Sequence, residues 1–159
     1  CSLDGGIFAW DLSGAHRFGH PFAFHVLNLA TTPNAPPVAP LAASADSKEF
    51  ATRLAALQVG LFSDSSLRRE ATITVHAKPG NVVQTVAWSP RAALLAVASS
   101  DGTLGLWNVA HKPRLVRTLH GSPNPRQPLW GTPVFSSDGT RLLEGGASDN
   151  DEALEDDGG

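Results

Sequence analysis

The segment SSDGTLGLWNV, Ser99–Val109, decides the fold because it joins a tight turn to a short apolar strand that ends in tryptophan. The Asp-Gly pair favours a turn, and the alternation of residues after it is typical of a strand. The chain repeats this design near its start, where SLDGGIFAWDL spans Ser2–Leu12. Two copies of a turn followed by a tryptophan strand indicate an array of β units.

A weaker third copy, ALQVGLFSD, spans Ala56–Asp64 with Phe62 in place of the tryptophan. The aromatic residues Trp10, Phe62 and Trp107 are therefore separated by 52 and 45 residues. That period is typical of a four-stranded unit rather than of a helical repeat. Repeat arrays usually bind other molecules rather than transform them, so the sequence predicts a binding function without naming the partner.

The best copy belongs to a run of four strand-like segments, which are Val82–Trp88, Leu94–Ser99, Thr103–Val109 and Arg114–Leu119. Short polar, Gly or Pro breaks separate them, which predicts an up-and-down sheet. In the third segment, Leu104 and Leu106 point to one face, whereas Trp107 and Val109 point to the other. A strand that is apolar on both faces needs cover on both, and sheets stacked around an axis supply it.

Three segments of similar sequence predict hairpins: VAWSPRAALLAVAS at 86–99, VFSSDGTRLLEGGA at 134–147 and, more loosely, AASADSKEFATRLA at 42–55. Trp88 then matches Phe135, and Leu95 matches Leu142. Residues 47–57 are the one candidate helix, but they show no sustained apolar stripe at the helical period. Four prolines in TTPNAPPVAPLAAS, residues 31–44, cannot donate to a sheet, which predicts a long exposed loop.

The composition is that of a globular protein, with 42% apolar and 17% charged residues and a net charge of −3. No apolar run is long enough to span a bilayer, so we expect no membrane partner. The single cysteine, Cys1, excludes an internal disulfide and favours a cytoplasmic protein. The basic residues are scattered apart from Arg68–Arg69 and Lys112–Arg117, so we expect no direct nucleic-acid binding.

These residues resemble WD repeats, the blades of β-propellers. The resemblance rests on the Asp-Gly turn six residues before tryptophan, at Asp4 and Trp10 and again at Asp101 and Trp107. It rests also on the Trp-Asp dipeptide at Trp10, and on His76, which lies 31 residues before Trp107. The resemblance implies an all-β fold, an incomplete β-propeller of about three four-stranded antiparallel blades.

In such blades a histidine, an aspartate, a strand hydroxyl and a tryptophan form a hydrogen-bonded network. The resemblance assigns this structural role to His76, Asp101 and Trp107, and to Asp4 and Trp10 in the first copy. Val97 occupies the position of the hydroxyl residue, so the third blade keeps three of the four members. Asp101 can accept from the His76 ring, and a buried Trp107 N–H needs a partner.

The predicted propeller segment covers residues 1–147, including the proline-rich loop at 31–44. It comprises a partial first blade (2–24), a degenerate second (about 36–75), a third (76–119) and half a fourth (120–147). Glu152 and Glu155 fall where the third blade has Leu104 and Trp107, so we expect residues 148–159 to be an acidic disordered tail. Closed propellers have about four to eight blades. We therefore expect a fragment whose partners are the remaining blades of a parent propeller, a second copy, or other proteins.

No residues indicate a catalytic, cofactor or metal site. His16, His20 and His25 cluster in the sequence, but Gly19 and Pro21 argue against a shared helix face, and no Cys or nearby carboxylate completes a metal site. The sequence contains no GxSxG elbow, phosphate-binding loop or dinucleotide motif. Trp130 follows PNPRQP in a loop at a blade rim, where it is either a partner contact or a loop anchor packed on its own blade.

The first blade, SLDGGIFAWDLSGAHRFGHPF, is similar to propeller segments of bacterial, especially actinobacterial, multidomain regulators. The resulting hypothesis is a non-catalytic protein-protein interaction scaffold within a larger bacterial signalling or transcription-regulating protein. One alternative is a propeller-based hydrolase or lyase, which would need polar residues converging from the innermost strands. Another is a truncated remnant without independent function, which the degenerate second blade supports.

Overall fold

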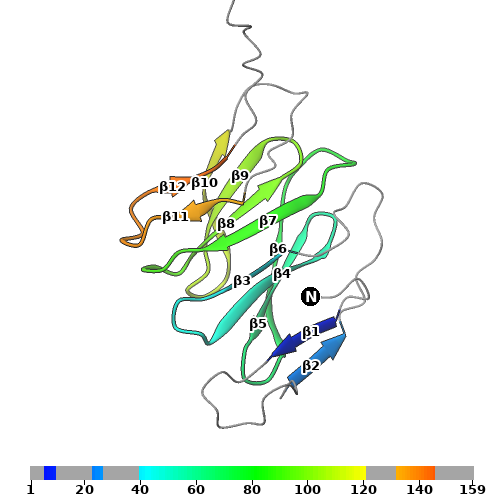
Figure 1. The fold of residues 1–159 in the computed structure, drawn as a ribbon. Coiled ribbons are helices and arrows are strands. Elements are labelled where there is room, and N and C mark those ends of the chain that lie inside the picture. The colour runs from blue at the N-terminus through cyan, green and yellow to red at the C-terminus, as the bar shows by residue number, and fades with distance from the viewer. Residues whose placement is uncertain (1–5, 10–22, 27–39, 121–131, 146–159) are drawn as a thin grey trace, which may run out of the picture.

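The computed structural model describes residues 6–9, 23–26, 40–120 and 132–145 (Figure 1). Every regular element in these ranges is a strand. The strands are β1 (Gly6–Ala9), β2 (Ala23–Val26), β3 (Leu41–Ala43), β4 (Glu49–Ala55), β5 (Gln58–Ser63), β6 (Arg69–Thr74), β7 (Val83–Trp88), β8 (Leu94–Ser99), β9 (Thr103–Asn108), β10 (Arg114–His120), β11 (Val134–Phe135) and β12 (Leu142–Leu143). The described chain is therefore all-β, as the sequence predicts.

Two antiparallel four-stranded sheets, β3–β6 and β7–β10, form the centre of the molecule, and each follows chain order. The β1–β2 and β11–β12 pairs are two-stranded antiparallel sheets. The predicted third blade is thus the β7–β10 sheet, and the degenerate second blade is the β3–β6 sheet. Incomplete propeller architecture of about three blades is confirmed for the part of the chain that the structure describes.

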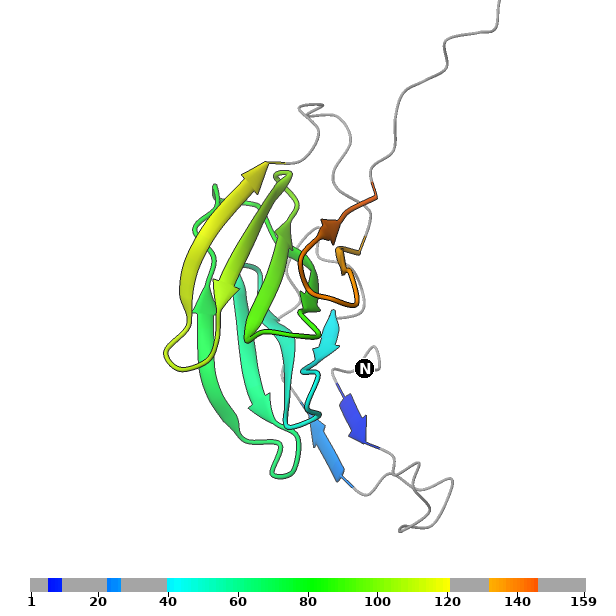
Figure 2. The ribbon, with the colours of Figure 1, turned by 90° about the vertical axis from the view of Figure 1, so that its left-hand side faces the viewer.

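The first strands of successive sheets lie next to one another, with β3 against β7 and β7 against β11. The sheets therefore spread from a common line, as the blades of a propeller do, and Figure 2 shows the two larger sheets stacked face to face. Arg53, which is 6% exposed, adds a polar tie between these sheets, because its Nη1 donates to the Val83 carbonyl at 2.8 Å. Burial lowers the pKa of this guanidinium.

The main core lies between the two four-stranded sheets. Its buried members are Ala51, Val59, Leu61, Ile73, Val83, Val86, Leu95, Val97, Trp107 and Val109. Burying each large aliphatic side chain of this set contributes about 1.5–3 kcal/mol to the hydrophobic stabilisation. Stacking of blades, rather than any single sheet, is therefore what encloses the core.

The β9 strand is covered on both faces, as its sequence requires. Trp107 and Val109 enter the main core, which the β3–β6 sheet closes. Leu104 and Leu106 belong to a second cluster on the opposite face, where Phe135 and Leu142 of the β11–β12 hairpin pack against it. The two-sided cover predicted from the alternation is confirmed.

The predicted hairpins also have the expected register. Trp88 pairs with Leu95 in β7–β8, and Phe135 pairs with Leu142 in β11–β12. The segment considered as a helix contains strand β4, which the absence of a helical stripe favoured. The part of the chain that the structure describes has no helix long and apolar enough to cross a membrane.

The prediction of a continuous proline-rich loop over residues 31–44 is wrong at its end. Leu41–Ala43 form β3 and pair with β4. Pro40 is the last proline of this segment, so Leu41–Ala43 have amide N–H groups for the ladder. The Pro40 carbonyl itself accepts a hydrogen bond from Thr52 Oγ1 at 2.8 Å, which anchors the start of the strand. The earlier residues of this loop lie outside the described ranges.

Candidate interaction surfaces

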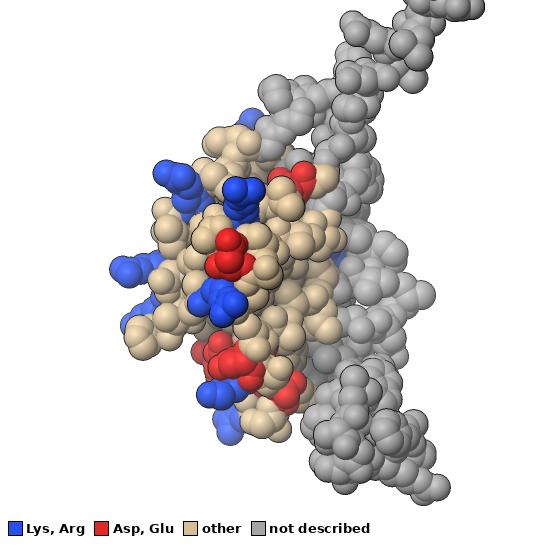
Figure 3. All heavy atoms as spheres, turned by 60° about the vertical axis from the view of Figure 1, so that its left-hand side comes forward, with Lys and Arg blue, Asp and Glu red and all other residues tan. Residues whose placement is uncertain are grey.

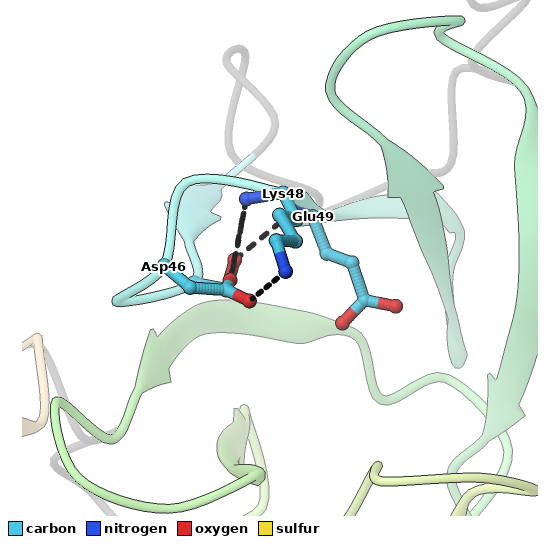
Figure 4. Close-up of polar contacts among 4 residues, drawn as sticks. Asp46, Lys48 and Glu49 are labelled. Carbon is cyan, nitrogen blue, oxygen red and sulfur yellow. Dashed lines mark hydrogen bonds and ion pairs between the residues drawn. The ribbon is translucent and has the colours of Figure 1, made fainter.

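The turn between β3 and β4 presents a compact polar group at one rim of the stacked sheets (Figure 4). Ser44 Oγ donates to Asp46 Oδ1 at 2.8 Å, and it accepts from the Lys48 and Glu49 amides at 3.2 and 3.0 Å. Lys48 Nζ lies 3.7 Å from Asp46 Oδ2. The Ser44 hydroxyl, followed by the Lys48 amide, lowers the pKa of Asp46, which stays an exposed carboxylate.

Two open pockets share this turn as a wall. The first, of about 260 Å³, lies between the β3–β4 turn and the β7–β8 turn, and residues 88–93 form its other side. The second, of about 500 Å³, lies between the β3–β4 turn and the β5–β6 turn. Both pockets therefore occupy the rim of the sheets, where loops held by rigid strands carry binding function in many folds.

The second pocket is acidic. Four carboxylate residues border it (Asp46, Glu49, Asp64 and Glu70), with Lys48 as its one lysine. Burial raises the pKa of Glu49, and the neighbouring Glu70 raises it further through a hydrogen bond and its charge. Among the described residues, no group of three or more His, Cys, Asp or Glu side chains has the geometry of a metal site.

The turn between β7 and β8 lacks an aspartate that its two counterparts share. The β3–β4 and β11–β12 turns place Asp46 and Asp138 two residues after a serine, whereas the β7–β8 turn places Arg91 there. Arg91 Nε donates across the sheets to the Ser137 carbonyl at 3.1 Å. A Cβ atom at Gly139, whose φ is +70°, would lie 3.0 Å from Arg91 Cβ, so this glycine admits the arginine. Where the other two turns have a hydrogen bond within the turn, the β7–β8 turn therefore has a hydrogen bond to the neighbouring hairpin.

Asp101 lies just before β9 and Trp107 lies near the other end of this strand, and the structure does not join His76, Asp101 and Trp107 by hydrogen bonds. Asp101 Oδ1 accepts from the Thr103 amide at 3.1 Å and from Thr103 Oγ1 at 2.6 Å. This contact holds the Asp-Gly turn, in which Gly102 has a φ of +81°. The predicted network among the three side chains stays a prediction.

His76 and Trp107 both border a small cavity of about 40 Å³, together with Val75, Thr103, Gly105, Leu115 and Thr118. Trp107 is 8% exposed, and its Nε1 is buried without a hydrogen-bond partner in the described part of the chain. A cavity of this size holds a water molecule, and threonine hydroxyls on its wall can complete the bonds of such a water. A cavity of this size is too small for a ligand much larger than water, and the structural role of these residues stays a prediction.

The other predicted site residues lie outside the described ranges. These are Asp4 and Trp10 of the first blade, Trp130 of the rim loop, and the histidines His16 and His20. His25 lies in β2, whose side chains are not described. The structural role of Asp4 and Trp10, and the choice between contact and anchor for Trp130, stay predictions.

Strand β10 is the outermost strand of its sheet, and all seven of its residues are exposed. Leu115, Val116 and Leu119 are 46%, 57% and 37% exposed, so this one strand presents three aliphatic side chains to solvent. Arg114 and Arg117 lie between and beside them. Figure 3 shows Lys and Arg side chains projecting from one flank of the described surface.

Comparison with solved structures identifies the architecture. The chain superimposes on the β-propeller domain of Myceliophteria thermophila Cps50 (Swd1) with a TM-score of 0.64 and 16% identity, over 91% of this chain and 43% of that one. The described chain has the fold of part of a β-propeller. It also matches a chain of the mitotic checkpoint complex (TM-score 0.65, 16% identity, 91% of this chain and 40% of that one). The RRP9 WD40 repeats match with a TM-score of 0.58 and 23% identity, over 77% of this chain and 34% of that one.

Sequence comparison gives a weaker likeness. A probable cytosolic iron-sulfur protein assembly protein 1 from Malassezia globosa is 44% identical over 50 residues, which are 31% of this chain and 14% of that protein. No protein-family model matches the chain. The chain spans less than half of each solved chain reported above and about a seventh of this curated relative.

Three structural features escaped the sequence analysis. The first is the close approach of Gly60 to the Phe62 ring and of Gly105 to the Trp107 ring. The shared patterns Gly-Leu-Phe and Gly-Leu-Trp could have indicated it. The tie from Arg91 to the next hairpin was signalled by arginine in a position where the two related turns have aspartate. The open edge of β10 was signalled by three aliphatic residues interspersed with arginines.

Proposed function

We propose that this chain is a non-catalytic segment of a β-propeller whose function is to bind other protein surfaces. The observation that supports this proposal most strongly is the outer face of the β11–β12 hairpin. Phe135 and Leu142 of this hairpin pack inward on the β7–β10 sheet. Their neighbours Val134 and Leu143, which form a cross-strand pair, are 57% and 64% exposed on the opposite side.

The exposed apolar face of the β11–β12 hairpin is what a blade presents when the next blade does not cover it. In repeat proteins each unit is covered by its neighbour, and a terminal unit needs either a polar outer face or a further partner. The Val134–Leu143 pair provides neither charge nor hydrogen-bonding groups. We therefore propose that a further sheet, from the remaining blades of a parent propeller or from a second copy, covers this hairpin. We also propose residues 1–147 as the propeller segment and 148–159 as a separate acidic tail.

Light scattering after size-exclusion chromatography of the full chain tests this proposal. The wild-type chain is expected to form a discrete dimer or larger closed species at micromolar concentration. Leu143→Glu is expected to return the mass to that of a monomer, because it places a charge in the covered face. Val116→Glu, at an aliphatic site on β10 that is 57% exposed against 64% for Leu143, is the matched control and is expected to leave the mass unchanged. A wild-type chain that stays a folded monomer at all concentrations would contradict the proposal that a second copy covers the hairpin.

The non-catalytic part of the proposal is supported by the fold and by the use of polar groups in the described turns. Ser44, Asp46 and Asp138 are engaged in turn hydrogen bonds, and the acidic pocket has no hydroxyl nucleophile paired with a histidine among the residues that border it. Assay of the purified chain against generic ester and glycoside substrates tests the alternative of a propeller-based hydrolase. Turnover that survives repurification would establish that alternative.

The kind of parent protein is a further part of the proposal. The likeness of the first blade to propeller segments of multidomain regulators supports a cytoplasmic signalling or transcription-regulating protein. The two organisms named among the similar proteins, Myceliophteria thermophila and Malassezia globosa, are not bacteria, so the comparisons give no support to a bacterial source.

A further inference from the structure

Strands β10 and β6 are both outer strands of their sheets, but β10 differs from β6 in two properties, the exposure of all its residues and the sign of its charges. Strand β10 pairs only with β9, so one row of its backbone N–H and C=O groups has no partner strand in the described sheet. None of its residues is buried. In the matching outer strand β6, by contrast, Ile73 is 1% exposed and enters the main core. The side chains of β10 are thus available to a partner, whereas those of β6 partly serve the fold.

The charge of this edge has one sign. Lys112, Arg114 and Arg117 lie in or next to β10, and the sequence from Gly102 to Ser137 contains no Asp or Glu. At the start of β6, by contrast, Arg68 and Arg69 lie next to Glu70, so charges of both signs are present. Like charges on two facing strands repel, so the basic residues keep the β10 edges of two copies apart. The same residues attract a strand that carries carboxylates.

The apolar residues of this edge restrict the partner further. Register with β9 places Leu115 on the face of Trp107, and Arg117 and Leu119 on the opposite face, with an irregularity at Val116. A strand added alongside β10 would therefore meet aliphatic surface on both faces. Single-stranded nucleic acid, the other polyanion to consider, is bound chiefly through aromatic stacking platforms, and β10 has no Phe, Tyr or Trp.

We propose that the free edge of β10 binds an extended segment of a partner protein in which acidic residues alternate with aliphatic ones. The segment adds a fifth strand to the β7–β10 sheet, with backbone hydrogen bonds supplying affinity and Arg114 and Arg117 selecting the carboxylates. This inference rests on the proposed interaction function and adds the class of partner. It uses a surface that is distinct from the Val134–Leu143 face, so the two can fail separately.

Fluorescence polarisation with the full chain and a labelled peptide of alternating Glu and Val residues tests the inference. Arg114→Glu combined with Arg117→Glu is expected to weaken binding by about tenfold or more. Arg68→Glu combined with Arg69→Glu, at the start of β6, is the matched control and is expected to leave binding within about twofold. Equal losses in both double variants would overturn the inference, because they would indicate attraction to net charge alone.

The backbone part of the inference has its own test. Two further peptides carry N-methyl groups on alternate amides, one along each edge of the strand. Strand addition predicts that one of them loses binding while the other keeps it. Equal binding of both methylated peptides would overturn the inference. So would equally tight binding of a single-stranded oligonucleotide that is lost in the Arg114→Glu, Arg117→Glu variant. The light-scattering mass is expected to stay unchanged in this variant, which separates this test from that of the proposed function.

Discussion

The β3–β6 and β7–β10 sheets have the same strand order and stack on each other, yet only one of them carries the repeat pattern in full. The β7–β10 sheet contains the Asp-Gly turn and Trp107. The β3–β6 sheet has neither, and Phe62 stands in the place of the tryptophan. Both nevertheless bury their aromatic residue, at 2% exposure for Phe62 and 8% for Trp107. The turn and the tryptophan are therefore not what makes a blade in this protein.

What the two sheets share is close contact between the aromatic ring and a glycine. A Cβ atom at Gly60 would lie 2.6 Å from the Phe62 ring, and one at Gly105 would lie 2.7 Å from Trp107 Nε1. Each ring thus lies over the backbone two residues earlier. Phe62 also stacks on Phe50, with ring centroids 5.2 Å apart and planes at 8°. The degenerate blade replaces a polar aromatic residue by an apolar pair that needs no hydrogen bond.

Phe62→Ala, in the sheet without the tryptophan, is expected to cause the largest loss of stability. Removal of this ring leaves a cavity against Phe50 and Leu67 and is expected to lower the free energy of unfolding by about 3–5 kcal/mol. Urea denaturation followed by tryptophan fluorescence measures the change. Leu115→Ala, at a half-exposed site of β10, is the control and is expected to cost much less. A Phe62→Ala variant as stable as this control would show that the β3–β6 sheet contributes little to the fold.

Gly60→Ala and Gly105→Ala are expected to have similar effects in the two sheets. Each new methyl group overlaps the ring two residues later, so each variant is expected to lose about 1–3 kcal/mol of stability. A double-mutant cycle tests whether the ring is the cause, because Gly105→Ala is expected to lower the free energy of unfolding less in a Trp107→Ala background than in the wild type. Additive losses in the Gly105 and Trp107 cycle would show that the ring does not lie over the glycine.

Val97→Thr tests whether the tryptophan of the β7–β10 sheet lacks a hydrogen-bond partner. Val97 faces Gly105 across the strands, and Trp107 Nε1, which has no described partner, lies close to Gly105. A threonine hydroxyl there is expected to accept from this N–H and to raise stability by about 0.5–1.5 kcal/mol. The gain is expected to disappear in a Trp107→Phe background, where the hydroxyl has no donor to meet. Equal effects in both backgrounds would contradict a role for the indole nitrogen.

The smallest expected effect is a change in stability with pH that comes from the aspartates in the β3–β4 and β11–β12 turns. Ser136 Oγ and the Thr140 amide lower the pKa of Asp138 from 3.8 to about 2, and the equivalent Asp46 shifts in the same direction. A lowered pKa means that the ionised form stabilises the fold above pH 3.8 and that this stabilisation is lost as the pH falls towards 2. The β7–β8 turn, with Arg91, has no such group.

Asp138→Asn tests this dependence, because the amide keeps an acceptor oxygen but cannot titrate. The difference in stability between wild type and Asp138→Asn is expected to narrow as the pH falls through this range, in urea titrations at each pH. Arg91→Gln is the control in the turn without a carboxylate, and its difference from wild type is expected to stay constant. A constant difference for Asp138→Asn as well would show that this carboxylate does not titrate with a lowered pKa.

The sequence predicted the β7–β10 sheet to within one residue at each strand, because Asp-Gly and proline mark its turns. It also placed Phe62 correctly, since hydrophobic alternation survives the loss of the motif. It did not predict the partners of polar side chains. Asp101 bonds to Thr103 two residues away, a local contact that forms without closing a loop to His76. The position of Arg91 is marked by arginine where the two related turns have aspartate, but its partner, the Ser137 carbonyl, depends on how neighbouring hairpins pack.

Hydrogen exchange of the full chain, read by mass spectrometry of peptides from β4–β5 and from β8–β9, tests most directly the claim that the two sheets are equally formed blades. Backbone amides in strands of one cooperative core open together and exchange at similarly slow rates. We therefore predict comparable protection for β5 and β9. Rapid exchange throughout β3–β6 alongside slow exchange in β7–β10 would contradict the claim, because it would show that the blade without turn and tryptophan does not hold its structure.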